Sequence, residues 1–141
     1  MWLKKIKSQI EIIKNSSYYE SDFGDTISDE SLLFNEMDYK NIYTLNDYRD
    51  FMKQIGYGEL DASFYIEDGP YPYQKIYGRE IPELKGTYIF ASDQSEYSYA
   101  FDSKNNYEVV DIDASGVLEN NYGSFKKFIT KKIEEIVIWR K

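Results

Sequence analysis

Hydrophobic positions recur along this chain with two periods, and each period predicts a different kind of element. Apolar residues three or four positions apart predict helices over residues 3–14, 44–55 and 124–137. Their apolar stripes are Leu3, Ile6, Ile10 and Ile13; Leu45, Tyr48, Met52 and Ile55; and Phe125, Phe128, Ile129, Ile133, Ile136 and Val137. Lysines surround the first stripe, as in helices that lie on membranes, but we favour packing of this stripe on the domain.

Alternation of aromatic and small residues predicts strands in the second half of the chain. Three strands separated by two turns are expected between Tyr88 and Asp113. The alternation is clearest in Tyr97-Ser98-Tyr99-Ala100-Phe101, which places the aromatic rings on one face. A further strand is expected over residues 60–67, LDASFYIE.

Polar residues and glycines mark the ends of several elements. Thr44 with Asp47 resembles a capping box at the start of the second helix, and Gly56 supplies a left-handed end. Ser28 is a candidate N-cap for a short helix over residues 31–37. The run Lys104-Asn105-Asn106 is typical of a turn between strands.

These elements predict an α+β fold in a single domain that spans residues 1–141. The expected sheet is mixed but largely antiparallel, with N-terminal helices and a C-terminal helix packed on it. Residues 1–27 are expected to form a basic helix followed by an acidic loop. All three prolines lie within residues 68–86, which we expect to be an ordered loop carrying Tyr71, Tyr73 and Tyr77.

Charge divides the chain into an acidic body and two basic ends. Residues 1–14 carry a net charge of +3 and residues 126–141 carry +4, whereas residues 15–125 carry −15. A surface this acidic repels nucleic acid and anionic lipid and attracts basic partners. Solubility alone is the simpler explanation of the acidity, because a soluble domain needs only a modest net charge.

Catalytic and metal-binding motifs are missing from the sequence. The chain has no histidine and no cysteine, so the commonest general base and metal ligand, and all thiolate chemistry, are excluded. Carboxylates are too abundant for any one pair to indicate glycoside hydrolysis. The segment from Asp102 fails as a calcium loop because Lys104 and Tyr107 occupy its third and sixth positions. We therefore predict a protein that is not an enzyme and needs no metal or cofactor.

Targeting signals are also missing from these residues. The N-terminal stretch is basic but lacks a continuous apolar run, so a secretory signal is not expected. No segment approaches the roughly 20 apolar residues of a membrane span. The expected location is the cytoplasm.

Several short runs, taken in order, resemble a known family. The run Tyr48-Arg49-Asp50-Phe51-Met52, followed by Gly56-Tyr57-Gly58, is similar to its capped helix and glycine turn. YIFASD from Tyr88 and YAFD from Tyr99 resemble its paired central strands. Val109-Val110-Asp111 resembles the strand after them, and Phe125, Phe128 and Ile129 resemble the start of its closing helix. This order resembles the SUKH superfamily, the immunity proteins of bacterial polymorphic toxin systems and relatives of the yeast cell-wall-regulator type, over residues 28–137.

Two departures from the family pattern stand beside this resemblance. Tyr43-Thr44 replaces the usual Leu-Pro before the capped helix, and Gln94-Ser95 replaces the frequent glycine between the central strands. The resemblance implies a mixed sheet with helices on one face. It also implies stoichiometric binding to a cognate toxin domain, often a nuclease.

The resemblance and the charge together give the functional hypothesis. We expect a cytoplasmic, non-catalytic immunity protein, a monomer or weak homodimer, that neutralises a basic, nuclease-type toxin domain through an acidic surface. Carboxylates of the central strands and tyrosines of the proline-rich loop are the expected contact residues: Asp93, Glu96, Asp111, Asp113, Tyr71 and Tyr73. No nucleic acid and no membrane span are expected. The alternative is a regulatory protein-interaction module of the same fold without a toxin partner.

Overall fold

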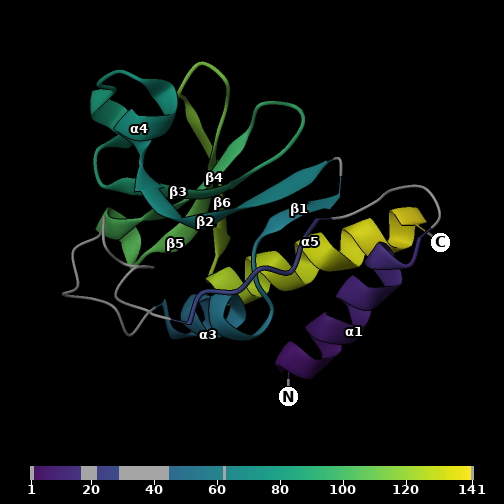
Figure 1. Cartoon of the computed structure of the whole chain (residues 1–141). Helices are drawn as coiled ribbons and strands as arrows, with labels where there is room; N and C mark the ends of the chain where they lie inside the picture. The colour runs from purple at the N-terminus through teal and green to yellow at the C-terminus, as the bar shows by residue number, and fades with distance from the viewer. Residues whose placement is uncertain (1, 17–21, 29–44, 62, 141) are drawn as a thin grey trace.

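The chain folds into one sheet with a layer of helices on one face (Figure 1). This computed structural model describes residues 2–16, 22–28, 45–61 and 63–140. The α-helices are α1 (Trp2–Lys14), α3 (Asn46–Gln54), α4 (Tyr73–Tyr77) and α5 (Phe125–Arg140), and the short 3-10 helices are η2 (Pro82–Leu84) and η3 (Ser103–Asn105). The strands are β1 (Gly58–Asp61), β2 (Phe64–Pro72), β3 (Thr87–Ser92), β4 (Ser98–Asp102), β5 (Glu108–Ile112) and β6 (Leu118–Gly123).

The six strands follow one another across the sheet in chain order, and each is antiparallel to the next. The α+β class is thus confirmed, while the sheet is antiparallel at every described pairing rather than mixed. The expected pairing of the central strands is confirmed by β3 and β4, where Tyr88 lies opposite Phe101. The strand expected over residues 60–67 is two strands, because the chain turns after Asp61 and returns as β2.

The main core lies between the sheet and the helices α1, α3 and α5. All six residues of the predicted C-terminal stripe are buried in it, as are the predicted stripes of α1 and α3. The rings of Phe125 and Phe128 contact Phe90 edge-on, at centroid distances of 5.6 and 5.8 Å. The predicted packing of the C-terminal helix on the central strands is confirmed, and so is the burial of the apolar stripe of α1.

A second, smaller core covers the opposite face of the central strands. It is built by α4 and the segment after it, which fold over the sheet in place of a plain loop. Its buried members are Tyr73, Ile81, Leu84, Ile89, Ala100, Val110 and Ile112. The proline-rich segment is therefore ordered, as expected, and it is part of the hydrophobic core.

The ends of α3 match the sequence in part. Leu45 occupies the N-cap without a side-chain hydrogen bond, and Thr44 lies outside the described residues. Gly56 has a φ of +118°, and a Cβ there would lie 2.4 Å from the carbonyl oxygen of Asp25. Only glycine fits this approach, because the neighbouring Tyr57 bridges to Asp25. The helix expected over residues 31–37 lies outside the described residues.

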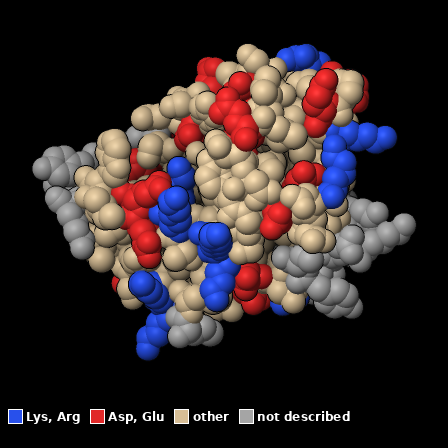
Figure 2. All heavy atoms as spheres, turned by 180° about the vertical axis from the view of Figure 1, so that it is seen from behind, with Lys and Arg blue, Asp and Glu red and all other residues tan. Residues whose placement is uncertain are grey.

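The two basic ends of the sequence meet in space. Helices α1 and α5 pack against each other and both end at the same side of the molecule (Figure 1). Lys126 lies over the ring of Trp2 at 5.5 Å, and Lys5 pairs with Glu134 at 3.9 Å. Seen from behind, Lys and Arg side chains gather on the side that these two helices form (Figure 2). Charge that is separated along the chain is therefore also segregated in the fold.

Candidate interaction surface

Aspartates begin the four tight turns between sequential strands. In each turn the Oδ1 atom of the aspartate accepts the backbone N–H two residues further on, at 2.8 to 3.0 Å. The four aspartates are Asp61, Asp93, Asp102 and Asp113. This local bond substitutes for a backbone turn bond and is a common reason for an aspartate at such a position.

The β3–β4 and β5–β6 turns share one hydrogen-bond pattern. Asp93 N–H donates to the Tyr97 carbonyl at 3.0 Å, and Asp113 N–H donates to the Val117 carbonyl at 3.0 Å. The fourth residue of each turn has positive φ, +66° at Glu96 and +88° at Gly116. Asp93 and Asp113 therefore have a structural role that is sufficient to explain them.

Asp111 is buried, with only 4% of its surface exposed, on the face of β5 that α5 covers. Its Oδ2 accepts the hydroxyl of Tyr122 at 2.6 Å, and its Oδ1 accepts the backbone N–H of Asn120 at 2.8 Å. Nearby, Tyr99 donates to Asp93 Oδ2 at 2.9 Å and accepts from Lys132 at 3.3 Å. These bonds satisfy the carboxylates from within the chain and hold β4, β5, β6 and α5 together.

The predicted tyrosines are also engaged inside the molecule. Tyr73 is 2% exposed and belongs to the second core, where its hydroxyl donates to Glu80 at 2.8 Å and accepts from Ile81 N–H at 3.2 Å. Tyr71 is half-buried and its hydroxyl donates to Asp68. Of the six residues expected to contact a partner, Tyr73 and Asp111 are thus placed where no partner could reach them without unfolding the region. Glu96 is exposed at its turn.

A different acidic surface lies on β2 and the segment beside it. Phe64 and Ile66 face the main core, so Tyr65 and Glu67 point to the other face of the sheet. Tyr65 is 40% exposed, and Asp68 beside it is exposed as well. We call Tyr65, Glu67, Asp68, Tyr71 and the neighbouring Asp22 the β2 surface.

Asp22 is fixed to the sheet edge beside this surface. Its Oδ1 atom accepts the N–H of Glu59 on β1 at 2.8 Å. The sheet edge at β1 is therefore capped by an acidic residue from a segment far away in the sequence. Apart from Tyr71, the residues of the β2 surface are not among those predicted, although the alternation in SFYIED could have indicated Tyr65 and Glu67.

Burial and acidic neighbours raise the pKa values of three residues at the β2 surface. Burial raises the pKa of Tyr65, and Glu67, Asp68 and Asp22 raise it further. Burial also raises the pKa of the Glu67 carboxyl, with a further contribution from Asp68. The hydrogen bond to Asp68 raises the pKa of Tyr71 to about 12. Burial and acidic neighbours thus account for these raised pKa values, and Lys75 reaches the Tyr71 ring. Among the described residues no ion pair neutralises Glu67 or Asp68.

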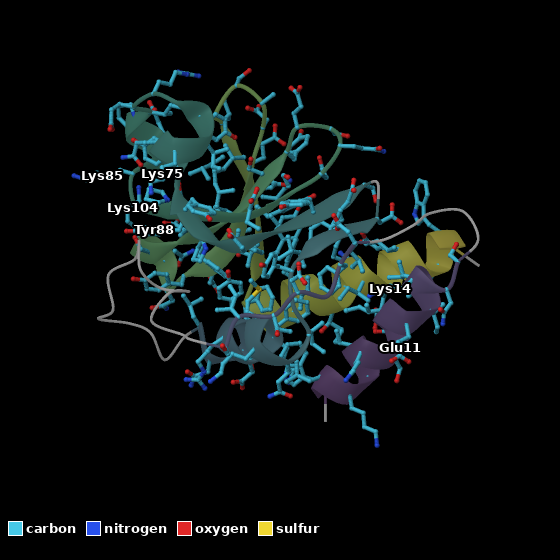
Figure 3. All side chains as sticks on the ribbon, viewed as in Figure 1. Glu11, Lys14, Lys75, Lys85, Tyr88 and Lys104 are labelled. Carbon is cyan, nitrogen blue, oxygen red and sulfur yellow. The ribbon has the colours of Figure 1, made fainter. Side chains whose placement is uncertain are left out.

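Lysines of the body gather at another place. Figure 3 shows Lys75, Lys85 and Lys104 grouped around Tyr88, on the side of the molecule away from β1. Lys75 reaches the rim of the β2 surface, with its Nζ 5.9 Å from the centre of the Tyr71 ring. The rest of that surface is left to a partner or to water.

The side chains of this surface can bind a partner through hydrogen bonds and charge. With their pKa values raised, the phenols stay protonated near neutral pH and act as hydrogen-bond donors. Among the described residues no group of three or more acidic side chains is arranged to hold a metal ion. Nor is any helix in this part of the chain long and apolar enough to cross a membrane.

Comparison with known proteins gives no family for this chain. No model of a protein family matches the sequence, and no curated protein matches it. The similarity to the SUKH superfamily therefore rests on the short runs described above.

Proposed function

We propose that this chain is a SUKH-like immunity protein, which binds a basic toxin domain through its β2 surface and so neutralises the toxin. The observation that carries the proposal is the group of acids, Glu67, Asp68 and Asp22, around the 40% exposed Tyr65. Lys75 lies only at the rim of this surface, over the Tyr71 ring. Ion-pairing of Glu67 and Asp68 with a lysine- or arginine-rich partner would relieve this repulsion. The resemblance of the sequence runs to immunity proteins indicates the class of partner.

The geometry favours an inhibitor that binds fast and stays bound. Complementary charge speeds association by orders of magnitude, whereas aromatic anchors in the contact slow dissociation. Tyr65 is the aromatic residue placed to act as such an anchor. The molecule exposes 7934 Å², and a standard interface takes about 800 Å² per partner, so such a contact would cover about a tenth of the surface.

Co-expression with a toxin domain encoded by a neighbouring gene tests the proposal in cells. We expect cells to survive with the intact protein and a complex to form at micromolar concentration. Cell death at the same rate with and without the protein, with no complex, would contradict it. A complex that forms without protecting the cell would favour the regulatory module instead.

Two variants with equal charge change test which surface is used. The first is Asp22→Asn with Glu67→Gln and Asp68→Asn, which keeps the hydrogen-bond acceptors and removes three charges from the β2 surface. The second, the matched control, is Glu83→Gln with Glu96→Gln and Glu119→Gln at exposed positions elsewhere.

The first variant should slow association roughly tenfold or more at low salt, and the control much less. Raising the salt to about 1 M, where the Debye length is about 3 Å, should remove the difference between the two variants. Tyr65→Ala should instead speed dissociation roughly 30-fold, as for an interface hot spot. Equal slowing by both charge variants would mean that only the net charge matters and would overturn the assignment of the surface.

A further inference from the structure

The adjoining ends of α1 and α5 expose apolar side chains that belong to neither of the two described cores. Trp139 is 89% exposed and Ile138 is 70% exposed, in the last turn of α5. Ile12 is 48% exposed near the end of α1, which packs beside α5 (Figure 1). We call these three residues the helix-end patch. Single exposed apolar residues are ordinary, but Ile138 and Trp139 are consecutive and both are largely exposed at this end of the helix pair.

The two helices that carry this patch have a net charge opposite to that of the rest of the protein. The sequences of α1 and α5 hold eight lysines, one arginine and three glutamates, a net charge of +6. Because the whole chain carries −8, the remainder carries −14. One of the three glutamates, Glu134, already pairs with Lys5. The helix pair therefore combines exposed Trp and Ile with an excess of lysine, which is the composition of surfaces that lie in the lipid headgroup region.

The apolar stripe of α1 does not provide this contact. The main core buries this stripe, which consists of Leu3, Ile6, Ile10 and Ile13. The pattern that is typical of a helix lying on a membrane therefore serves packing inside the protein. The exposed residues belong to a different side of the helix pair, and they come from two segments that are far apart in the sequence.

We propose that the helix-end patch docks this protein reversibly on an anionic lipid surface, with Trp139 and Ile138 entering the headgroup layer and the lysines facing lipid phosphates. A second copy of the chain is a poorer occupant, because it would bring two helix pairs with a net charge of +6 each together. Nucleic acid would use the lysines but would gain nothing from exposed isoleucines. The acids of the sheet side point away from the bilayer and are screened within about 10 Å at 0.1 M salt.

Tryptophan fluorescence gives a direct test, since the chain has two tryptophans and one is in the patch. Trp2→Phe leaves Trp139 as the emitter. With vesicles of phosphatidylcholine and phosphatidylglycerol we expect a blue shift of the Trp139 emission, and co-sedimentation that weakens with salt. Vesicles of phosphatidylcholine alone should give neither.

Substitutions locate the contact. Ile138→Ser with Trp139→Ser should lower the partition coefficient for the anionic vesicles at least tenfold. Lys127→Gln and Lys131→Gln should each lower it roughly fivefold, as expected for lysines near an anionic surface. Ile76→Ser is the matched control, because Ile76 is a 44% exposed isoleucine on α4, away from the helix pair, and should change nothing.

Three outcomes would overturn the proposal. One is an unchanged Trp139 emission with anionic vesicles, and another is an equal loss of binding in the patch variant and in the Ile76 control. The third is a Trp139 emission that shifts with protein concentration in the absence of lipid, which would mean that a second copy covers the patch. None of these outcomes bears on toxin binding, which uses another face.

Discussion

The carboxylates of the central strands and those of the β2 surface belong to the same residue types but differ in the hydrogen bonds and charges around them. Asp93, Asp111 and Asp113 each accept two or more hydrogen bonds from their own chain. At the β2 surface, Glu67 and Asp68 raise the pKa values of their neighbours, and neither forms an ion pair with another described residue. Acidic composition alone therefore does not indicate a binding surface.

Tyrosines account for much of this difference. A phenol can donate one hydrogen bond to a carboxylate while its ring fills apolar space. Tyr99, Tyr122 and Tyr73 do so in the two cores, bonding Asp93, Asp111 and Glu80. Tyr65 keeps 40% of its surface exposed, with acids around it. We expect partner binding at the β2 surface, where the polar side chains are less fully hydrogen-bonded within the chain.

The largest expected effect comes from the core beneath the central strands. Phe128→Ala should lower the free energy of unfolding by about 3–5 kcal/mol, because the buried ring contacts Phe90, Tyr99 and Tyr122. Denaturant unfolding measures the loss. A loss below about 1 kcal/mol would place the start of α5 outside the core. The central strands would then not be the rigid region with which the β2 surface is compared.

A buried carboxylate should be costly to remove, and an exposed one should not. Asp111→Ala leaves the Tyr122 hydroxyl and the Asn120 N–H without their partner, so we expect a loss of about 2–3 kcal/mol. Asp68→Ala, at the β2 surface, should cost under about 1 kcal/mol. Toxin affinity should show the reverse order when it is measured on the folded fraction. Equal stability losses would show that the two regions do not differ in the way described.

The sequence predicted those parts of the fold that depend on local periodicity. The stripes of α1, α3 and α5 and the strands β3 to β5 are spaced by helix and strand geometry, so they could be recognised directly. The division between β1 and β2 was missed because its turn, from Asp61 to Ser63, contains neither glycine nor proline. Strand β6, LENNYG, was missed because an edge strand with exposed polar residues has no apolar alternation.

The candidate surface was harder to predict, because a count of acidic residues along the sequence does not show on which face of the sheet each side chain lies. In the run Val109-Val110-Asp111-Ile112, alternation already places Asp111 on the same side as Val109, facing the helices. That could have removed Asp111 from the expected contacts. The hydroxyl partners of Tyr73 and Tyr99, in contrast, depend on tertiary packing and could not be foreseen.

Backbone conformation at the two matching turns gives a smaller, stabilising prediction. Glu96 has a φ of +66°, a region that glycine adopts without cost, and Gly116 holds the same place in the β5–β6 turn. Glu96→Gly should raise the free energy of unfolding by about 0.5–1 kcal/mol. Gly116→Ala should lower it, since its φ is positive and a Cβ would lie 2.6 Å from Ile81 Cδ1. Toxin association that slows markedly in Glu96→Gly would return this turn to the interface.

The smallest effect concerns Glu67 and its pH dependence. Burial, with Asp68, raises the pKa of its carboxyl above the usual 4.5, so the folded state holds this proton more tightly than the unfolded chain does. The favourable contribution of the protonated carboxyl is complete below the unfolded pKa and is lost as the pH rises through the raised folded pKa.

Glu67→Gln should therefore stabilise the protein at pH 7, by less than about 1 kcal/mol because the site is partly solvated. The gain should vanish below about pH 4, where Glu67 is protonated in both states. Chemical denaturation of both proteins across this range measures the difference, with Glu83→Gln as the exposed control. A Glu67→Gln protein that is less stable at pH 7 would show that this carboxylate is satisfied after all, and the two regions would no longer be distinct.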